Sequence, residues 1–170
     1  MSGYTPSHPV AQFLQRLAWF LDNRQISGAF AGTRRSALSP AKENYHSLGL
    51  KKVAIHGGIP PLPGYPQAII SAPREAEVGA VLSSFVPIRL INNNVTSDSG
   101  LLEMLDLSWR VRDELARYWE EVGGPVKLAD GARPFESDYF MAPGGTFEGQ
   151  PMPPIQGLTL NIPVRLLPAR

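Results

Sequence analysis

The chain has 170 residues, enough for one domain with a hydrophobic core, and we expect a single domain over residues 1–170. Its formal net charge is +1, so overall charge gives no reason to expect binding to nucleic acid or to a membrane surface. The absence of cysteine excludes disulfides, thiolate metal sites and cysteine nucleophiles. No apolar stretch approaches the roughly 18–20 residues of a membrane span, and the N-terminus lacks the pattern of a signal peptide.

Residues 8–23 have the apolar spacing of an amphipathic helix, and Pro9 suits its first turn. Residues 24–52 follow without periodicity and are expected to form a long basic loop, with six basic residues against one acidic residue. The candidate contacts with DNA or with an acidic partner in this loop are Arg34, Arg35, Lys42, Lys51 and Lys52. The alternative is a flexible, solvated loop. Sparse aromatic residues and the lack of a known DNA-reading motif disfavour sequence-specific DNA binding.

Strands are expected at residues 52–56, 67–72, 81–92 and 157–167, and residues 73–79 are typical of a polar turn. The last strand alternates strictly between apolar and polar residues, which predicts a sheet covered on one face. Residues 125–156 are rich in proline and glycine, which favours a loop or an irregular hairpin with short strands at 138–142 and 146–148.

Residues 99–122 give the clearest helix prediction, with capping residues before it and Gly123, Gly124 and Pro125 after it. Asp106 and Arg110 stand four residues apart on its polar side and can form an ion pair. Its inward-facing stripe is expected to contain Leu101, Met104, Leu105, Ser108, Val111, Leu115, Trp119 and Val122. The order of elements predicts an α+β fold, in which two helices cover one face of a mixed or antiparallel sheet of about four to five strands, joined by long Pro/Gly-rich loops.

One short sequence occurs twice in similar form. Residues 86–91 (VPIRLI) match residues 162–167 (IPVRLL) in residue type at every position, with Pro87 and Arg89 corresponding to Pro163 and Arg165. Because proline donates no N–H to a strand ladder, we expect both prolines at a sheet edge or at a bulge. The match is either chance similarity or a sign that both strands form edges that a neighbouring subunit completes.

No motif for catalysis or metal binding is present in the sequence. His8, His46 and His56 are far apart and have no second ligand at metal-binding spacing. There is no nucleophile elbow and no phosphate-binding glycine loop, and the paired carboxylates of the 99–122 helix have arginine neighbours. We therefore expect no enzyme activity, no metal and no cofactor, and we expect a protein that binds other protein subunits.

The chain resembles the tail-terminator (tail-completion) proteins of tailed bacteriophages. The resemblance lies in the layout over residues 8–167: an N-terminal helix, a strand with the sequence YP-x-A-I-I from Tyr65, a long strand, a long helix that begins LLEMLDL from Leu101, and a terminal strand. The loops at 24–52 and 125–156 are longer than the minimal form of that family.

The resemblance implies a non-enzymatic virion protein, assembled in the host cytoplasm, that forms a homohexameric ring at the end of the tail tube. Such a ring ends tail growth and joins the tail to the head, so its partners would be copies of itself, the tail tube protein and the head–tail connector protein. The basic loop would then face the channel through which DNA passes. The alternatives are another head–tail neck protein or minor tail subunit, a regulatory module that binds a small ligand, and an enzyme whose site forms only between subunits.

Overall fold

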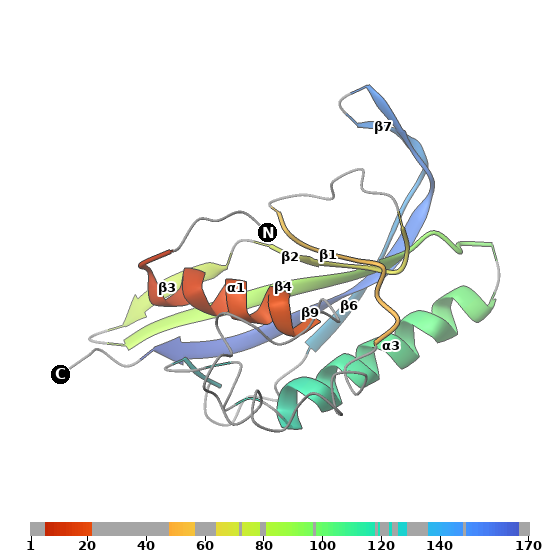
Figure 1. Cartoon of the computed structure of the whole chain (residues 1–170). Helices are drawn as coiled ribbons and strands as arrows, with labels where there is room; N and C mark the ends of the chain where they lie inside the picture. Colours follow the sequence, from red (N-terminus) through yellow and green to blue (C-terminus); the bar gives the residue numbers. More distant parts are fainter. Residues whose placement is uncertain are drawn as a thin grey trace.

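The computed structural model describes residues 6–21, 48–56, 64–71, 73–78, 81–96, 98–117, 119, 123, 126–128, 136–147 and 149–166. Within these ranges two helices lie on one side of a large, twisted sheet, and a narrow two-stranded extension leaves the body (Figure 1). The helices are α1 (Pro9–Leu21) and α3 (Asp98–Arg117). The strands are β1 (Lys52–Ile55), β2 (Gln67–Ile70), β3 (Arg74–Val78), β4 (Val81–Asn92), β5 (Lys127–Leu128), β6 (Glu136–Ala142), β7 (Gly145–Phe147), β8 (Gln150–Met152) and β9 (Ile155–Leu166).

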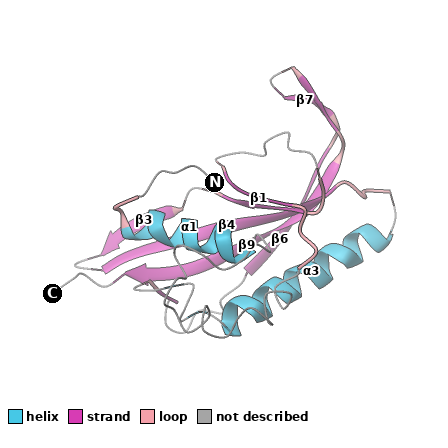
Figure 2. Ribbon diagram, in the orientation of Figure 1, coloured by secondary structure: helices cyan, strands magenta, loops and turns pink. Residues whose placement is uncertain are grey.

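The main sheet is mixed, and its five-strand path runs β1-β2-β4-β9-β5. Strand β3 also pairs with β4, and β6 also pairs with β9. Only the β1–β2 pair is parallel among these described strands. The two twelve-residue strands β4 and β9 pair from Leu82↔Leu166 to Asn92↔Gln156 and form the centre of the sheet. The α+β prediction, with two helices on one face of a mixed sheet, is confirmed (Figure 2).

The main hydrophobic core lies between the helices and the sheet. Alternate residues of β4 and β9 face the helices, as the strict alternation of β9 predicts. Leu48 and Leu50, at the end of the predicted basic loop, are also buried in this core. The side chains that fill it from the helices include Phe13, Leu17, Leu21, Met104, Leu107, Val111 and Leu115, and those from the sheet include Ala68, Ile70, Val86, Ile88, Leu90, Leu158, Leu160 and Ile162.

A second, smaller cluster covers part of the opposite face of the sheet. Ile69, Ile91 and Ile155 are almost completely buried there, and Tyr65 and Phe140 pack against them. Partial burial raises the pKa of the Tyr65 hydroxyl, because desolvation disfavours the ionised phenolate. This face is therefore partly covered by apolar side chains, whereas the alternation of the last strand predicts a sheet covered on one face.

Pro87 and Pro163 were expected at a sheet edge or at a bulge, and the expectation of edge strands is wrong, because β4 and β9 are each paired on both sides. The two strands of the repeated sequence are partners of each other, with Val86 opposite Ile162. Each proline instead faces a break between two shorter outer strands. Pro87 lies between the part of β4 that pairs with β2 and the part that pairs with β3, and Pro163 lies between the β6 and β5 segments of β9.

The backbone at Pro87 shows why the break falls there. The Ser71 amide donates to the Pro87 carbonyl oxygen at 3.0 Å, so the polar backbone atoms of Pro87 point away from β9. In an antiparallel ladder the N–H of residue 87 would donate to the Ser71 carbonyl oxygen in return, and proline has no N–H to donate. The β2–β4 ladder ends at this position, while the central β4–β9 ladder continues.

Strand β3 corrects the prediction of a polar turn at 73–79. Its five residues pair with β4 from Arg74↔Phe85 to Val78↔Val81, which makes a hairpin with a very short connection. Charged residues in a short outer strand are common, because they discourage pairing with other chains. The polar composition therefore indicates an outer strand here, and a turn prediction from polarity alone fails.

Candidate assembly surface

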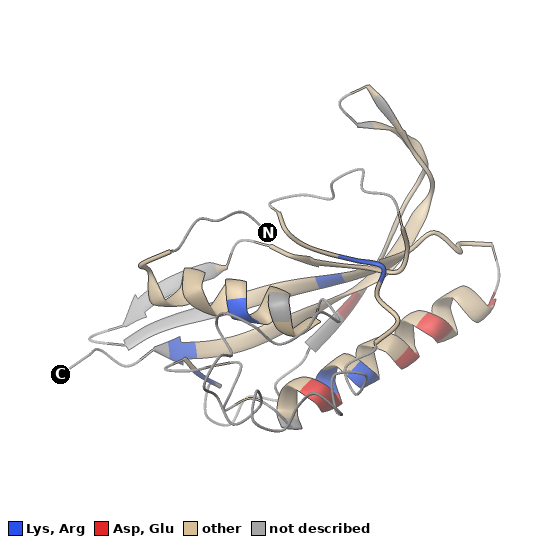
Figure 3. Ribbon diagram, viewed as in Figure 1, with Lys and Arg blue, Asp and Glu red and all other residues tan. Residues whose placement is uncertain are grey.

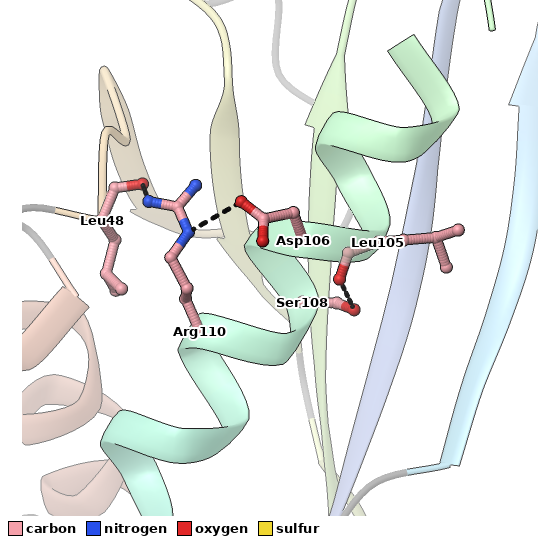
Figure 4. Close-up of polar contacts among 5 residues, drawn as sticks. All are labelled: Leu48, Leu105, Asp106, Ser108 and Arg110. Atoms are coloured by element: carbon pink, nitrogen blue, oxygen red, sulfur yellow. Dashed lines mark hydrogen bonds and ion pairs between the residues drawn. The ribbon is translucent and has the colours of Figure 1, made fainter. Parts of the chain in front are cut away.

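Helix α3 has a charged side and an apolar side. On the charged side, Arg110 Nε lies 3.3 Å from Asp106 Oδ2, and Arg110 Nη1 donates to the Leu48 carbonyl oxygen at 3.3 Å (Figure 4). The predicted Asp106–Arg110 pair is thus present, and it also ties α3 to the chain segment that enters β1. Figure 4 shows Leu105 on the opposite side of the helix from Arg110.

The apolar side of α3 carries four exposed large side chains, which we call the α3 strip. Leu101 is 39% exposed, Leu102 63%, Leu105 46% and Trp109 69%. Their spacing of three and four residues places them along one stripe of the helix. The strip is therefore open to solvent along the helix.

The strip also corrects the predicted inward stripe of this helix. Met104, Ser108, Val111 and Leu115 are buried as expected, whereas Leu101 and Leu105 are not. Leu107, which the prediction left out, is buried in their place. The apolar residues of α3 extend around a wider part of the helix than the sheet covers, so some of them remain exposed.

Two exposed apolar side chains of β6 lie on the same face of the sheet as α3. Tyr139 is 48% exposed and Met141 58%, and their cross-strand partners are Leu158 and Gln156. Leu158 belongs to the main core, which places Tyr139 on the helix side of the sheet. The Tyr139 hydroxyl donates to Gln156 Oε1 at 3.3 Å, which orients the ring. Within the described residues β6 pairs only with β9, so these side chains stand at an edge of the sheet.

A narrow extension, which we call the arm, comprises residues 143–154 and contains β7 and β8 (Figure 1). It continues β6 and β9 beyond the sheet, and β7 pairs with β8 from Gly145↔Met152 to Phe147↔Gln150. Gly149 has a φ of 78°, the left-handed conformation that glycine adopts without strain in a tight turn. Strands are therefore present near both predicted positions, as β6 (from Glu136) and β7, but the predicted hairpin between them is wrong. Strand β6 pairs with β9, and β7 pairs with β8, a strand that was not predicted.

A hollow of about 360 Å³ lies where the arm joins the sheet. Among the described residues that line it, Arg89 is the one with a charge, beside Thr146 and a largely apolar wall that includes Ala142, Met152 and Ile155. Arg89 is half-buried, and it has no hydrogen-bond or ion-pair partner among the residues that the structure describes. The predicted candidate Arg89 thus faces the base of the arm and not an open edge.

The other predicted contact residues do not form one cluster with it. Lys51 and Lys52 are exposed at the start of β1, and Arg165 is half-buried near the end of β9. Arg89 pairs with Thr159, six positions from Arg165 along β9, which is about 20 Å in an extended strand. Arg34, Arg35 and Lys42 lie outside the described residues.

No protein-family model matches the chain, and no curated protein sequence matches it. In the part of the chain that the structure describes, no three His, Asp or Glu side chains lie together as metal ligands would. Neither described helix is both long enough and apolar enough to cross a membrane.

Proposed function

We propose that the chain is a non-enzymatic structural subunit that binds copies of itself in a phage virion. In this proposal it forms a ring at the end of the tail tube, ends tail growth and joins the tail to the head connector. The layout of the sequence supports the family, and one structural observation supports self-assembly. That observation is the α3 strip, which presents four large apolar side chains to solvent on a helix whose opposite side is charged.

The energetic argument starts from the cost of leaving apolar surface in water. Burial of such surface contributes about 25 cal/mol per Å² of accessible area, so contiguous exposed apolar side chains favour association with another surface. Trp109 is 69% exposed, and tryptophan is one of the residue types enriched at the interface positions that dominate binding energy. The strip is not part of the main core. The side chains of α3 that pack in that core are Met104, Leu107, Val111 and Leu115.

The basic residues have a secondary place in the proposal. Lys51 and Lys52 are exposed at the start of β1, where they are available to an anionic partner such as DNA in a tail channel. Arg34, Arg35 and Lys42 share this proposed role on sequence grounds alone. Their contribution is electrostatic, so it should weaken as salt concentration rises.

Self-assembly is tested by light scattering coupled to size-exclusion chromatography. The wild-type chain should form an oligomer, alone or with purified tail tubes, and Leu105→Glu should shift it to a monomer. Glu103→Lys is the matched control, since Glu103 is exposed on the same helix but is not three or four residues from any residue of the strip. It changes the charge by two units and should leave the oligomer intact. A wild-type chain that stays monomeric under both conditions contradicts the proposal.

The virion role needs its own experiment. Phage particles assembled without the chain should show tail tubes of irregular length and heads without tails in electron micrographs. Supplying the wild-type chain to such extracts should restore tails of uniform length, and the Leu105→Glu variant should not. Uniform, joined tails in particles that lack the chain would exclude the tail-terminator role while leaving self-assembly open.

The hollow beside Arg89 favours one alternative, a module that binds a small ligand. A single arginine within an apolar wall suits a carboxylate attached to an apolar group. A panel of aliphatic and aromatic carboxylates would raise the melting temperature of the wild-type chain, and not of Arg89→Gln, if this alternative holds.

A further inference from the structure

We infer that the arm of one copy packs against the α3 strip of the next copy. This inference rests on the self-assembly proposed above, and it names the two surfaces that meet. Both belong to the same chain but lie at different places on it, so the contact is of the head-to-tail kind. Head-to-tail contacts generate closed rings when the rotation between copies closes, and filaments when it does not.

The first reason is the chemistry of the arm. Over residues 143–154 the sequence has a single charged residue, Glu148, and four prolines. Figure 3 shows no Lys, Arg, Asp or Glu on the described part of the arm, whereas α3 carries both signs of charge. Exposed loop tips in solvated proteins are usually polar, so an extension with one charge in twelve residues is suited to burial against a protein surface.

The second reason is that the arm gains little from its own body. It is a two-stranded hairpin beyond the end of the sheet, and an isolated hairpin of this kind is marginally stable in water. Pro143, Thr146, Pro151, Pro153 and Pro154 are all exposed. Packing against a partner would therefore stabilise the arm as well as the contact.

The third reason is the match between the two surfaces. The exposed proline rings of the arm are apolar and conformationally restricted, so they can pack on an aromatic ring with little loss of conformational entropy. Trp109 of the strip presents such a ring. The charged side of α3 is the poorer docking site for an arm with a single charge, since the Asp106 and Arg110 side chains would lose water against its apolar surface.

The fourth reason is geometric. The arm points away from α3 of its own chain, so it leaves that strip uncovered (Figure 1). The strip of one chain and the arm of another are thus both available for contact. Because each copy offers one arm and one strip, every copy in a ring has both surfaces satisfied.

The test uses two variants that each lack one surface. In the armless variant, Asn-Gly replaces residues 143–154 and joins Ala142 to Ile155, which are cross-strand partners that a two-residue turn can connect. The second variant, Trp109→Glu, keeps the arm and disrupts the strip. Each should be monomeric alone by light scattering, whereas the wild type is oligomeric.

Mixing the two variants gives the decisive result. The arm of Trp109→Glu should bind the intact strip of the armless variant, so an equimolar mixture should form a heterodimer and nothing larger. Trp109 of the armless variant should then become buried, and its fluorescence emission should shift to shorter wavelength. A mixture that stays monomeric overturns the inference, because a strip-to-arm contact requires this pairing.

The remaining outcomes separate this inference from the proposed function. An armless variant that keeps the wild-type oligomer overturns the arm contact and leaves self-assembly standing. A Trp109→Glu variant that keeps the wild-type oligomer removes Trp109 from the interface and overturns the inference, while self-assembly through another surface stands. Should the armless variant lose its fold by circular dichroism, Pro151→Asp takes its place, because it puts a charge on the exposed arm and leaves the strip intact. Alone it should be monomeric, and it should form a heterodimer with Trp109→Glu, whose arm is unchanged; a mixture of these two variants that stays monomeric overturns the inference.

Discussion

The ring of Phe140 on β6 occupies the space beside Gly157, its cross-strand partner on β9, that a side chain would otherwise fill. A Cβ atom on Gly157 would lie 2.6 Å from Phe140 Cζ and would also collide with the Leu90 carbonyl oxygen. Phe140 packs there against the cluster of Ile69, Ile91 and Ile155. The close contact therefore holds β6, and with it the base of the arm, against the centre of the sheet.

Gly157→Ala should lower the free energy of unfolding by about 1–3 kcal/mol, because the added methyl group must displace a packed ring and a backbone carbonyl. Gly145→Ala is the control, since a Cβ there meets no atom within 4 Å, and its effect should stay within about 0.5 kcal/mol. Urea unfolding followed by circular dichroism measures both. Equal stability of the two variants would show that the Phe140 ring moves aside at little cost.

The sequence predicts most of the sheet because its central strands carry a strong alternating pattern. The apolar residues of 157–167 identify the core face of β9 correctly. The position of these strands within the sheet is a different matter, since it depends on which segments pair. The two copies of the repeated sequence pair with each other, and local pattern contains no information about that choice.

Pro87 offers a test of the explanation given for the broken outer ladder. Pro87→Val should keep or raise stability, because the new N–H can donate to the Ser71 carbonyl, whose own amide already bonds to residue 87. Val86→Pro should lower the free energy of unfolding by more than about 2 kcal/mol, because the N–H of Val86 faces β9 and its loss leaves a buried acceptor unpaired. Thermal unfolding of the two variants gives the comparison. Similar losses of stability in the two variants would mean that the backbone groups of residues 86 and 87 do not point in the directions described above.

Tyr65 gives a pH-dependent prediction. Its folded-state pKa is raised by burial above the usual value, so the stability that it contributes is present below that usual value and is lost as pH rises through the raised pKa. Between about pH 8 and about pH 11, the wild-type chain should therefore lose more stability than Tyr65→Phe, which cannot ionise. Chemical unfolding of both proteins at each pH measures the difference. An identical loss in the two proteins would remove Tyr65 as a source of alkaline destabilisation.

The candidate site was only partly predictable from sequence. The 99–122 segment was identified as an amphipathic helix, but its apolar arc includes both core residues and the exposed Leu101 and Leu105. Helical spacing alone cannot separate the two groups, because the boundary depends on how much of the helix the sheet covers. The signal that points to a surface role is the excess of apolar residues, with Leu102 and Trp109 lying beyond the predicted stripe.

Two leucines on α3 make folding and assembly separable by experiment. Leu107 is 2% exposed and packs in the main core, so Leu107→Ala should lower the free energy of unfolding by about 2–5 kcal/mol. Leu105 is 46% exposed, so Leu105→Ala should change the stability of the monomer by less than about 1 kcal/mol while weakening self-association. Urea unfolding at low protein concentration measures the first effect and sedimentation velocity the second. If Leu105→Ala destabilises the monomer as much as Leu107→Ala does, then Leu105 belongs to the core. That result would contradict the proposal that the apolar side of α3 is an assembly surface.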